Sequence, residues 1–281
     1  MSELTAFSKL MQGRDMPLTE LMNYFNDQLQ TQARTKSLQK TGFFKADNSY
    51  WGRFGNLILG SKFQAIHSFN EDKLIGYNSE SLVRSATGNS LNIDSIFNAL
   101  DSTDQIIHLD RLVRTLNSLN YLQQFDGRKD LLSLQVQPRH ITSVVSDHGK
   151  TFEKILSDCG LGPQRVLLHT RLLDAATLPH FQQALDSYRQ RGYKIGIHIS
   201  EPQDYELLLT LGLTPDVIFA DQPALTRLLI EKPLPDLLEP SMRILIAKKP
   251  NLDINISSAL HGYLFDNESS NLLPQSEISS Q

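Results

Sequence analysis

The chain has 281 residues, of which 40% are hydrophobic and 21% charged, and these values are typical of a globular protein with one large domain and an appendage, or with two small domains. Its formal net charge of -4 gives no global field that would attract nucleic acid or an anionic membrane, so neither is expected as a partner. Cys159 is the only cysteine, which excludes an intramolecular disulfide and a cysteine-based zinc cluster.

No targeting or membrane-spanning segment is expected. Residues 1–15 mix charges early and lack the apolar core of a secretory signal. The longest apolar stretches, such as 166–168 and 244–247, have the length of strands and are far too short to cross a bilayer. We therefore expect a cytoplasmic protein.

Residues 1–60 are predicted to form a mainly helical N-terminal extension with a linker. Pro17 suits a first helical turn, and apolar residues follow it at three- and four-residue spacing, namely Leu18, Leu21, Met22, Phe25 and Leu29. This stripe either packs on the rest of the chain or contacts a partner or a second copy. Between Thr35 and Trp51 the pattern becomes polar, which indicates a linker or a wrapping loop.

From Lys62 onward, short apolar runs alternate with helical patterns. The predicted strands cover 63–69, 73–77, 131–136, 166–170, 194–199, 217–220 and 242–247. The predicted helices cover 93–100, 106–125, 152–159, 179–191, 205–211 and 223–230. Such alternation predicts an α/β fold with a parallel sheet, and its length favours a (β/α)8 TIM-like barrel over residues 61–266. The polar tail, residues 267–281, is expected to be disordered.

In such a barrel, chemistry takes place at the C-terminal ends of the strands, which form the mouth. The residues there are Gln135, Gln137, His169, Arg171, His198, Ile199, Phe219, Asp221 and Lys248. A metal-dependent hydrolase of phosphate esters needs several carboxylates at this place, and this chain offers almost none. The sequence also lacks a phosphate-cradling glycine loop, a G-x-S-x-G elbow and an H-E-x-x-H motif.

His169 and His198 lie on neighbouring strand ends, with His261 as a third candidate, and could bind Zn²⁺ or a similar ion. The alternative is that they are ordinary polar residues at a solvated mouth, since no carboxylate completes the set. Cys159 is interpreted as a small, semi-buried filler rather than as a nucleophile.

Several short motifs resemble, in order, those of EAL-domain proteins, the cyclic-di-GMP phosphodiesterase family. Residues 50–55 (Y-W-G-R-F-G) and 63–66 (F-Q-A-I) resemble the family's lead-in and first strand. The other similar segments are 109–112 (L-D-R-L), 134–139 (L-Q-V-Q-P-R), 215–221 (P-D-V-I-F-A-D) and 262–265 (G-Y-L-F). The resemblance covers roughly residues 50–265 and implies a barrel that hydrolyses cyclic di-GMP with two divalent metals.

The resemblance also shows where the family's site residues would fall, and most are replaced. Residues 76–84 (G-Y-N-S-E-S-L-V-R) carry two more residues than the name-giving G-Y-E-A-L-L-R, so either Asn78 replaces the glutamate or Glu80 retains it. The other substituted positions are Gln135 for a metal-binding asparagine, His169 for a glutamate, His198 and Ile199 for paired aspartates, Phe219 for a lysine, Lys248 for a glutamate and His261 for a glutamine.

These substitutions imply a catalytically inactive, degenerate EAL-type barrel without a metal cofactor. Ile199 has no electron pair for a metal, Lys248 would repel a divalent cation, and Phe219 cannot position water. We therefore expect no enzyme activity and no catalytic residue. Gln64 and Arg84 match family positions that contact nucleotide, and together with Glu80 they are interpreted as a vestigial nucleotide-binding set.

The first hypothesis for function is a bacterial regulatory protein that acts by contacting another protein, in the control of motility, biofilm or transcription. Its partner would be an unidentified regulatory protein or a second copy in a homodimer, and cyclic di-GMP is not an expected partner. One alternative is a sensor that binds cyclic di-GMP without hydrolysis. A second alternative is a residual metal-dependent phosphodiesterase built on His169, His198 and Glu80.

Overall fold

The computed structural model describes residues 18–36, 40–68, 73–125, 129–143, 156–157, 160–172, 178–210, 212–221, 223–224, 227, 243–246 and 260–265. The predicted tail at 267–281 lies outside these ranges, and so do most of the helices predicted at 152–159 and 223–230. None of the helices within these ranges is long and apolar enough to span a membrane.

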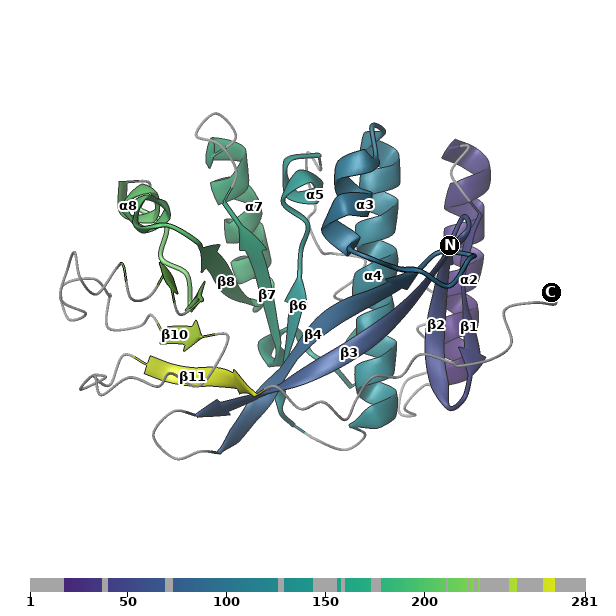
Figure 1. Ribbon diagram of the computed structural model, residues 1–281, viewed down its shortest axis with the longest axis horizontal. Helices are drawn as coiled ribbons and strands as arrows, with labels where there is room; N and C mark the ends of the chain where they lie inside the picture. The colour runs from purple at the N-terminus through teal and green to yellow at the C-terminus, as the bar shows by residue number, and fades with distance from the viewer. Residues whose placement is uncertain are drawn as a thin grey trace.

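Eight strands close into a barrel through their pairing, and Figure 1 labels all of them except β9. They are β3 (Leu57–Ser68), β4 (Leu74–Arg84), β6 (Leu131–Gln135), β7 (Val166–Arg171), β8 (Lys194–Ile199), β9 (Val217–Ala220), β10 (Arg243–Ile246) and β11 (Leu260–Phe265). The pairing runs β3-β11-β10-β9-β8-β7-β6-β4, and β4 pairs back to β3. All neighbours are parallel except β3, which is antiparallel to both β4 and β11. The prediction of a TIM-like barrel is therefore confirmed.

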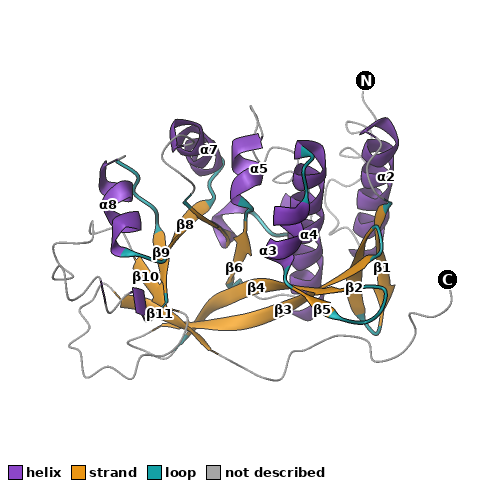
Figure 2. Ribbon diagram, turned by 45° about the horizontal axis from the view of Figure 1, so that its top comes forward, coloured by secondary structure: helices purple, strands orange, loops and turns teal. Residues whose placement is uncertain are grey.

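Figure 2 shows the helices along one side of these strands. They are α3 (Ile93–Ala99), α4 (Thr103–Gln124), α5 (Pro138–Ser143), the short 3-10 helix η1 (Pro163–Arg165), α7 (Leu178–Gln190) and α8 (Pro202–Thr210). Alternate residues of β6, β7 and β8, such as Leu134, Leu168 and Ile197, pack in one cluster with Phe181 and Tyr188 of α7. Because side chains alternate along a strand, the residues between them face the barrel interior.

The interior has its own, smaller apolar layer. Ile66 of β3, Leu167 of β7, and Val217 and Phe219 of β9 form one buried cluster. Leu167 precedes His169 by two positions, so the two side chains share this inner face. The inner layer thus identifies which strand residues face the interior of the barrel.

The N-terminal extension contains the predicted helix, α2 (Leu18–Lys36), followed by β1 (Thr41–Ala46) and β2 (Ser49–Phe54). Leu21, Phe25 and Leu29 are buried in one cluster with Phe43 of β1, so the apolar stripe of α2 packs within the chain. Strands β1 and β2 pair antiparallel with each other and then with β3, while the two-residue β5 (Ser90–Leu91) pairs with β4.

The prediction of a linker or loop between Thr35 and Trp51 is wrong, because all of β1 and the beginning of β2 lie there and form a hairpin. The turn between the two strands is Asp47-Asn48, both with positive φ of 49° and 59°. Short polar residues tolerate this left-handed conformation, which matches the twist of a two-residue hairpin loop. The polar residues Asp47 and Asn48, which suggested a linker, therefore form a tight turn between two strands.

Helix α4 lies between the barrel and the N-terminal extension and is buried over most of its length (Figure 1). Leu109, Leu112 and Leu116 contact the same apolar cluster as α2 and β1. Asp110 accepts hydrogen bonds at 2.8 Å from the Arg114 side chain and from the backbone N–H of Gln137. This carboxylate therefore joins α4 to the chain that leaves β6.

Two asparagines further along α4 fix the extension to the barrel. The Asn120 side chain bonds both the N–H and the C=O of Tyr50 in β2, each at 2.8 Å, and donates to Ser61 Oγ in β3 at 3.0 Å. Ser61 Oγ in turn donates to Asn117 Oδ1 at 2.7 Å. Buried amides that satisfy backbone groups in this way specify one packing of α4 against the sheet.

Replacing Asp110 by alanine should lower the free energy of unfolding by about 3–5 kcal/mol, because the buried guanidinium of Arg114 would lose the carboxylate that it bonds. Denaturant unfolding followed by circular dichroism measures this loss. Asp101→Ala, an exposed substitution just before α4, is the matched control and should change stability by less than about 0.5 kcal/mol. A loss below about 1 kcal/mol for Asp110→Ala would contradict the assigned role.

Candidate functional site at the barrel mouth

Three aromatic rings from neighbouring strands meet inside the barrel mouth. His169 Nδ1 of β7 and His198 Nε2 of β8 are 2.7 Å apart and share a hydrogen bond. The His198 ring stacks on Phe219 of β9 with centroids 4.6 Å apart and an interplanar angle of 17°, and His169 lies 4.7 Å from the same ring. We name these three residues the ring cluster.

Gly196 makes room for the ring cluster. It pairs with His169 on one side, and a Cβ atom at this position would lie 2.7 Å from the Phe219 ring and 2.9 Å from the Cβ of His169. Both distances are shorter than real carbon contacts, so any larger residue would push the rings apart. The close packing of His169 and Phe219 therefore requires glycine at position 196.

Both histidines of the ring cluster are neutral at pH 7. Burial lowers the pKa of His169 well below its usual value, and His198 and Arg171 lower it further. Burial, followed by the charge of Arg171, lowers the pKa of His198 to about 3. Desolvation disfavours an imidazolium, and a nearby guanidinium adds repulsion. One ring nitrogen of the pair therefore donates to the other without either ring carrying a charge.

The two divalent metals that the family resemblance implies do not fit the described residues of the mouth. The facing nitrogens of His169 and His198 bond each other, and Phe219 has no donor atom. Within the described part of the chain, no group of three or more His, Cys, Asp or Glu side chains is placed to hold a metal ion. Hard divalent cations require converging oxygen ligands, which this arrangement does not supply.

Gln135 and Ile199 also come from the predicted site, and the structure places them differently. Gln135 ends β6 in register with His169 and is partly exposed. Ile199 is buried in the apolar cluster between the strands and the helices, so it faces away from the mouth. The reason is strand alternation, because His198 and Ile199 are consecutive and only one of them can face inward.

The name-giving segment lies in β4, and its two candidate residues differ in environment. Asn78 is 7% exposed and pairs with Gln64 of β3 and Ser133 of β6, so it is part of the barrel wall. Glu80 is exposed and lies opposite Lys62, beyond the last β4–β6 pair. Asn78, and not Glu80, therefore lies within the part of β4 that pairs with β6.

The predicted nucleotide-binding set is spread along the β3–β4 hairpin. Gln64 is buried in the barrel wall, Glu80 is exposed, and Arg84 ends β4 opposite Ile58 and next to β5. Lys248 lies outside the described residues, and for His261 the structure gives only the backbone position in β11. Cys159 also lies outside the described residues.

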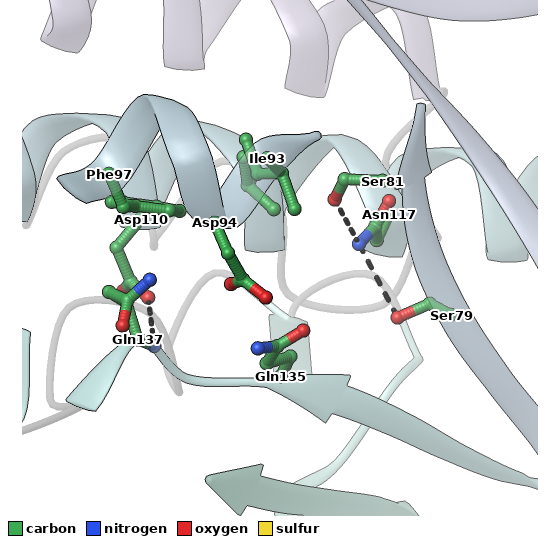
Figure 3. Close-up of a pocket in the computed structure, with 10 residues that line it drawn as sticks. Ser79, Ser81, Ile93, Asp94, Phe97, Asp110, Asn117, Gln135 and Gln137 are labelled. Atoms are coloured by element: carbon green, nitrogen blue, oxygen red, sulfur yellow. Dashed lines mark hydrogen bonds between the residues drawn. The ribbon is translucent and has the colours of Figure 1, made fainter. Parts of the chain in front are cut away.

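A small polar pocket beside the mouth was not predicted (Figure 3). It lies between β4, β6, α3 and α4 and is lined by Ser79, Ser81, Ile93, Asp94, Phe97, Asp110, Val113, Asn117, Gln135 and Gln137. Asn117 Nδ2 lies 3.4 Å from the hydroxyls of both Ser79 and Ser81. The two serines at alternate positions of a strand were the available signal, since such spacing places both on one face.

Comparison with solved structures shows the fold. The chain resembles a standalone EAL protein from Vibrio cholerae with bound c-di-GMP, at 15% identity and a TM-score of 0.55, over 74% of this chain and 89% of that one. It also resembles Bacillus subtilis YkuI, an EAL-domain protein in complex with c-di-GMP and calcium, at 18% identity and a TM-score of 0.53, over 73% of this chain and 53% of that one.

A third similar structure is the Klebsiella pneumoniae BlrP1 complex with calcium and c-di-GMP, at 18% identity and a TM-score of 0.50, over 74% of this chain. The chain spans only about half of the Klebsiella and Bacillus proteins, 54% and 53% of their lengths. No family model matches the sequence, and no curated protein matches it either. The fold is thus that of EAL-domain barrels.

One of our expectations is overturned by these structures. We did not expect cyclic di-GMP as a partner, yet the similar proteins from Vibrio, Bacillus and Klebsiella are all complexes with this dinucleotide. That expectation rested on the substituted metal ligands, whereas a dinucleotide has bases, sugars and phosphates that a protein can also contact directly. The expectation that excluded cyclic di-GMP was therefore wrong.

The neutral histidines predict a pH dependence of stability. Their pKa values are low when folded and about 6.5 when unfolded, so the unfolded chain takes up more protons as the pH falls. The stability that they contribute is complete above about pH 6.5 and is lost progressively as the pH falls toward the folded pKa, which is about 3 for His198.

Denaturant unfolding of the wild type between pH 7.5 and pH 5 should show a falling free energy, with each histidine contributing up to about 1.4 kcal/mol per pH unit. The double variant His169→Gln with His198→Gln serves as the control and should show a shallower slope. Equal slopes for the two proteins would mean that the ring cluster does not hold its histidines neutral.

Proposed function

We propose that this chain is a regulatory protein of bacterial cyclic-di-GMP signalling that does not hydrolyse the dinucleotide and acts in the cytoplasm by contacting another protein. The observation that carries the proposal is the ring cluster, in which three positions of the family's catalytic mouth pack against one another. Side chains that bond each other and stack are not available to coordinate two metals or to position a water.

The rest of the fold supports a protein kept for its surface. Buried polar residues of α4, from Asp110 to Asn120, join the extension to the barrel through many specific hydrogen bonds. Such networks fix the relative position of the elements that they join. An extension held rigidly beside a barrel is a suitable surface for a partner protein.

A second candidate is a sensor that binds cyclic di-GMP without cleaving it. The structures of similar proteins with bound c-di-GMP favour it. Calorimetric titration with cyclic di-GMP distinguishes the two candidates, because micromolar binding favours a sensor. If bound cyclic di-GMP altered the contact with a partner protein, the chain would act both as a sensor and as a regulator.

Incubation of the full chain with cyclic di-GMP and Mn²⁺ or Mg²⁺ should yield no linear dinucleotide above a protein-free control, measured by liquid chromatography. Phe219→Lys restores the family's lysine alone and should remain inactive, because the histidines still occupy the metal positions. An active EAL phosphodiesterase is the positive control. Product formed by the wild type and lost in His198→Ala would contradict the proposal.

A further inference from the structure

Three buried polar atoms in the barrel wall have no hydrogen-bond partner among the described residues. They are Asn78 Oδ1 of β4, Ser133 Oγ of β6 and His169 Nε2 of β7. The three residues are 7%, 0% and 3% exposed, so bulk water does not satisfy them. A buried polar group without a partner costs about 1–3 kcal/mol, and three of them on adjacent strands require an explanation.

The strand register places these atoms on one inner face. Asn78 pairs with Ser133, and Ser133 pairs with Leu167, which belongs to the inner apolar layer. His169 follows Leu167 by two positions and so shares its face. Since Nδ1 of His169 bonds His198, its Nε2 is directed away from the ring cluster. The three orphaned atoms therefore belong to side chains on the inner face of three adjacent strands, β4, β6 and β7.

Charge selects the kind of guest that this region accepts. The lining groups are an amide, a hydroxyl and a neutral imidazole, with no carboxylate to offset a cation. Arg171, whose charge already disfavours protonation of both histidines, would also disfavour a metal ion nearby. An uncompensated ion in such an interior is heavily penalised, whereas water can both donate and accept.

We propose that Asn78, Ser133 and His169 together bind one uncharged, water-sized molecule inside the barrel, and that water itself is the guest. It donates to Asn78 Oδ1, exchanges a hydrogen bond with Ser133 Oγ and bonds His169 Nε2. The ordered water thus takes the interior of the mouth that a divalent ion would otherwise need. The inference concerns the same mouth as the proposed function and rests on it only in requiring that no divalent ion binds there.

The sign of a stability change tests this site. If water bridges the groups, Ser133→Ala removes one of its hydrogen bonds and should lower Tm by about 2–4 °C. If no guest is present, the same change removes an unsatisfied hydroxyl and should raise Tm, which would overturn the proposal. Asn78→Leu, which has a similar shape, should also lower Tm because the water loses one hydrogen bond. This second variant shows that the effect is not specific to position 133.

Two serine variants calibrate the measurement. Ser79→Ala, on the neighbouring strand, loses a hydroxyl that already donates to the Ser133 carbonyl at 2.8 Å, and should lower Tm in either case. Ser95→Ala, exposed on α3, should leave Tm unchanged. Adding a tenfold excess of Zn²⁺ or Mn²⁺ to the wild type should not raise Tm, and a rise that His169→Gln abolishes would identify a metal guest and overturn the proposal.

A crystal structure of the full chain at high resolution, grown with Mn²⁺, gives the direct readout. The expected result is a density peak within about 3.2 Å of at least two of the three atoms, without anomalous signal. An empty cavity, a protein side chain or a metal at that place would each overturn the site. Hydrolysis of cyclic di-GMP would instead refute the proposed function, so the two failures are distinguishable.

Discussion

The ion pair between Asp110 and Arg114 inside α4 is the interaction on which the rest of the structure depends. Both side chains are nearly inaccessible, and the carboxylate also holds the backbone of Gln137 at the end of β6. His140 of α5 lies 3.3 Å from the same carboxylate, so this buried ion pair constrains α4, the end of β6 and α5 together. Because the opposite side of α4 packs on the extension, the same helix places α2, β1 and β2 beside the barrel.

The barrel mouth follows a second constraint, strand alternation. His169 and His198 face inward because the residues on either side of each pack toward the helices, as Leu168, Ile197 and Ile199 show. The three rings, with Gly196 leaving space beside them, pack against one another in the mouth, and their burial keeps the two imidazoles uncharged. The ring cluster is therefore aromatic and uncharged, in contrast to the carboxylate ligands that a two-metal hydrolase requires.

Much of the barrel could be predicted from the sequence, since its strands are apolar runs between helical patterns and β8 and β9 coincide with the predicted ranges. The β1–β2 hairpin could not, because Phe43 and Tyr50 are separated by a polar turn that resembles a linker. The sequence pattern placed Ile199 at the end of its strand, but it could not show whether the side chain faces the barrel interior or the helices. The ring cluster depends on register between strands, and the orphaned groups of Asn78 and Ser133 depend on cross-strand pairs.

The central claim is that this EAL-type barrel carries the ring cluster in its mouth in place of divalent metals. Titration of the full chain with Mn²⁺, followed by electron paramagnetic resonance, tests this claim most directly, because bound and free Mn²⁺ give different signals. The account predicts only free Mn²⁺ at micromolar metal, with or without cyclic di-GMP. Two tightly bound Mn²⁺ ions per chain, lost in the double variant His169→Gln with His198→Gln, would contradict it.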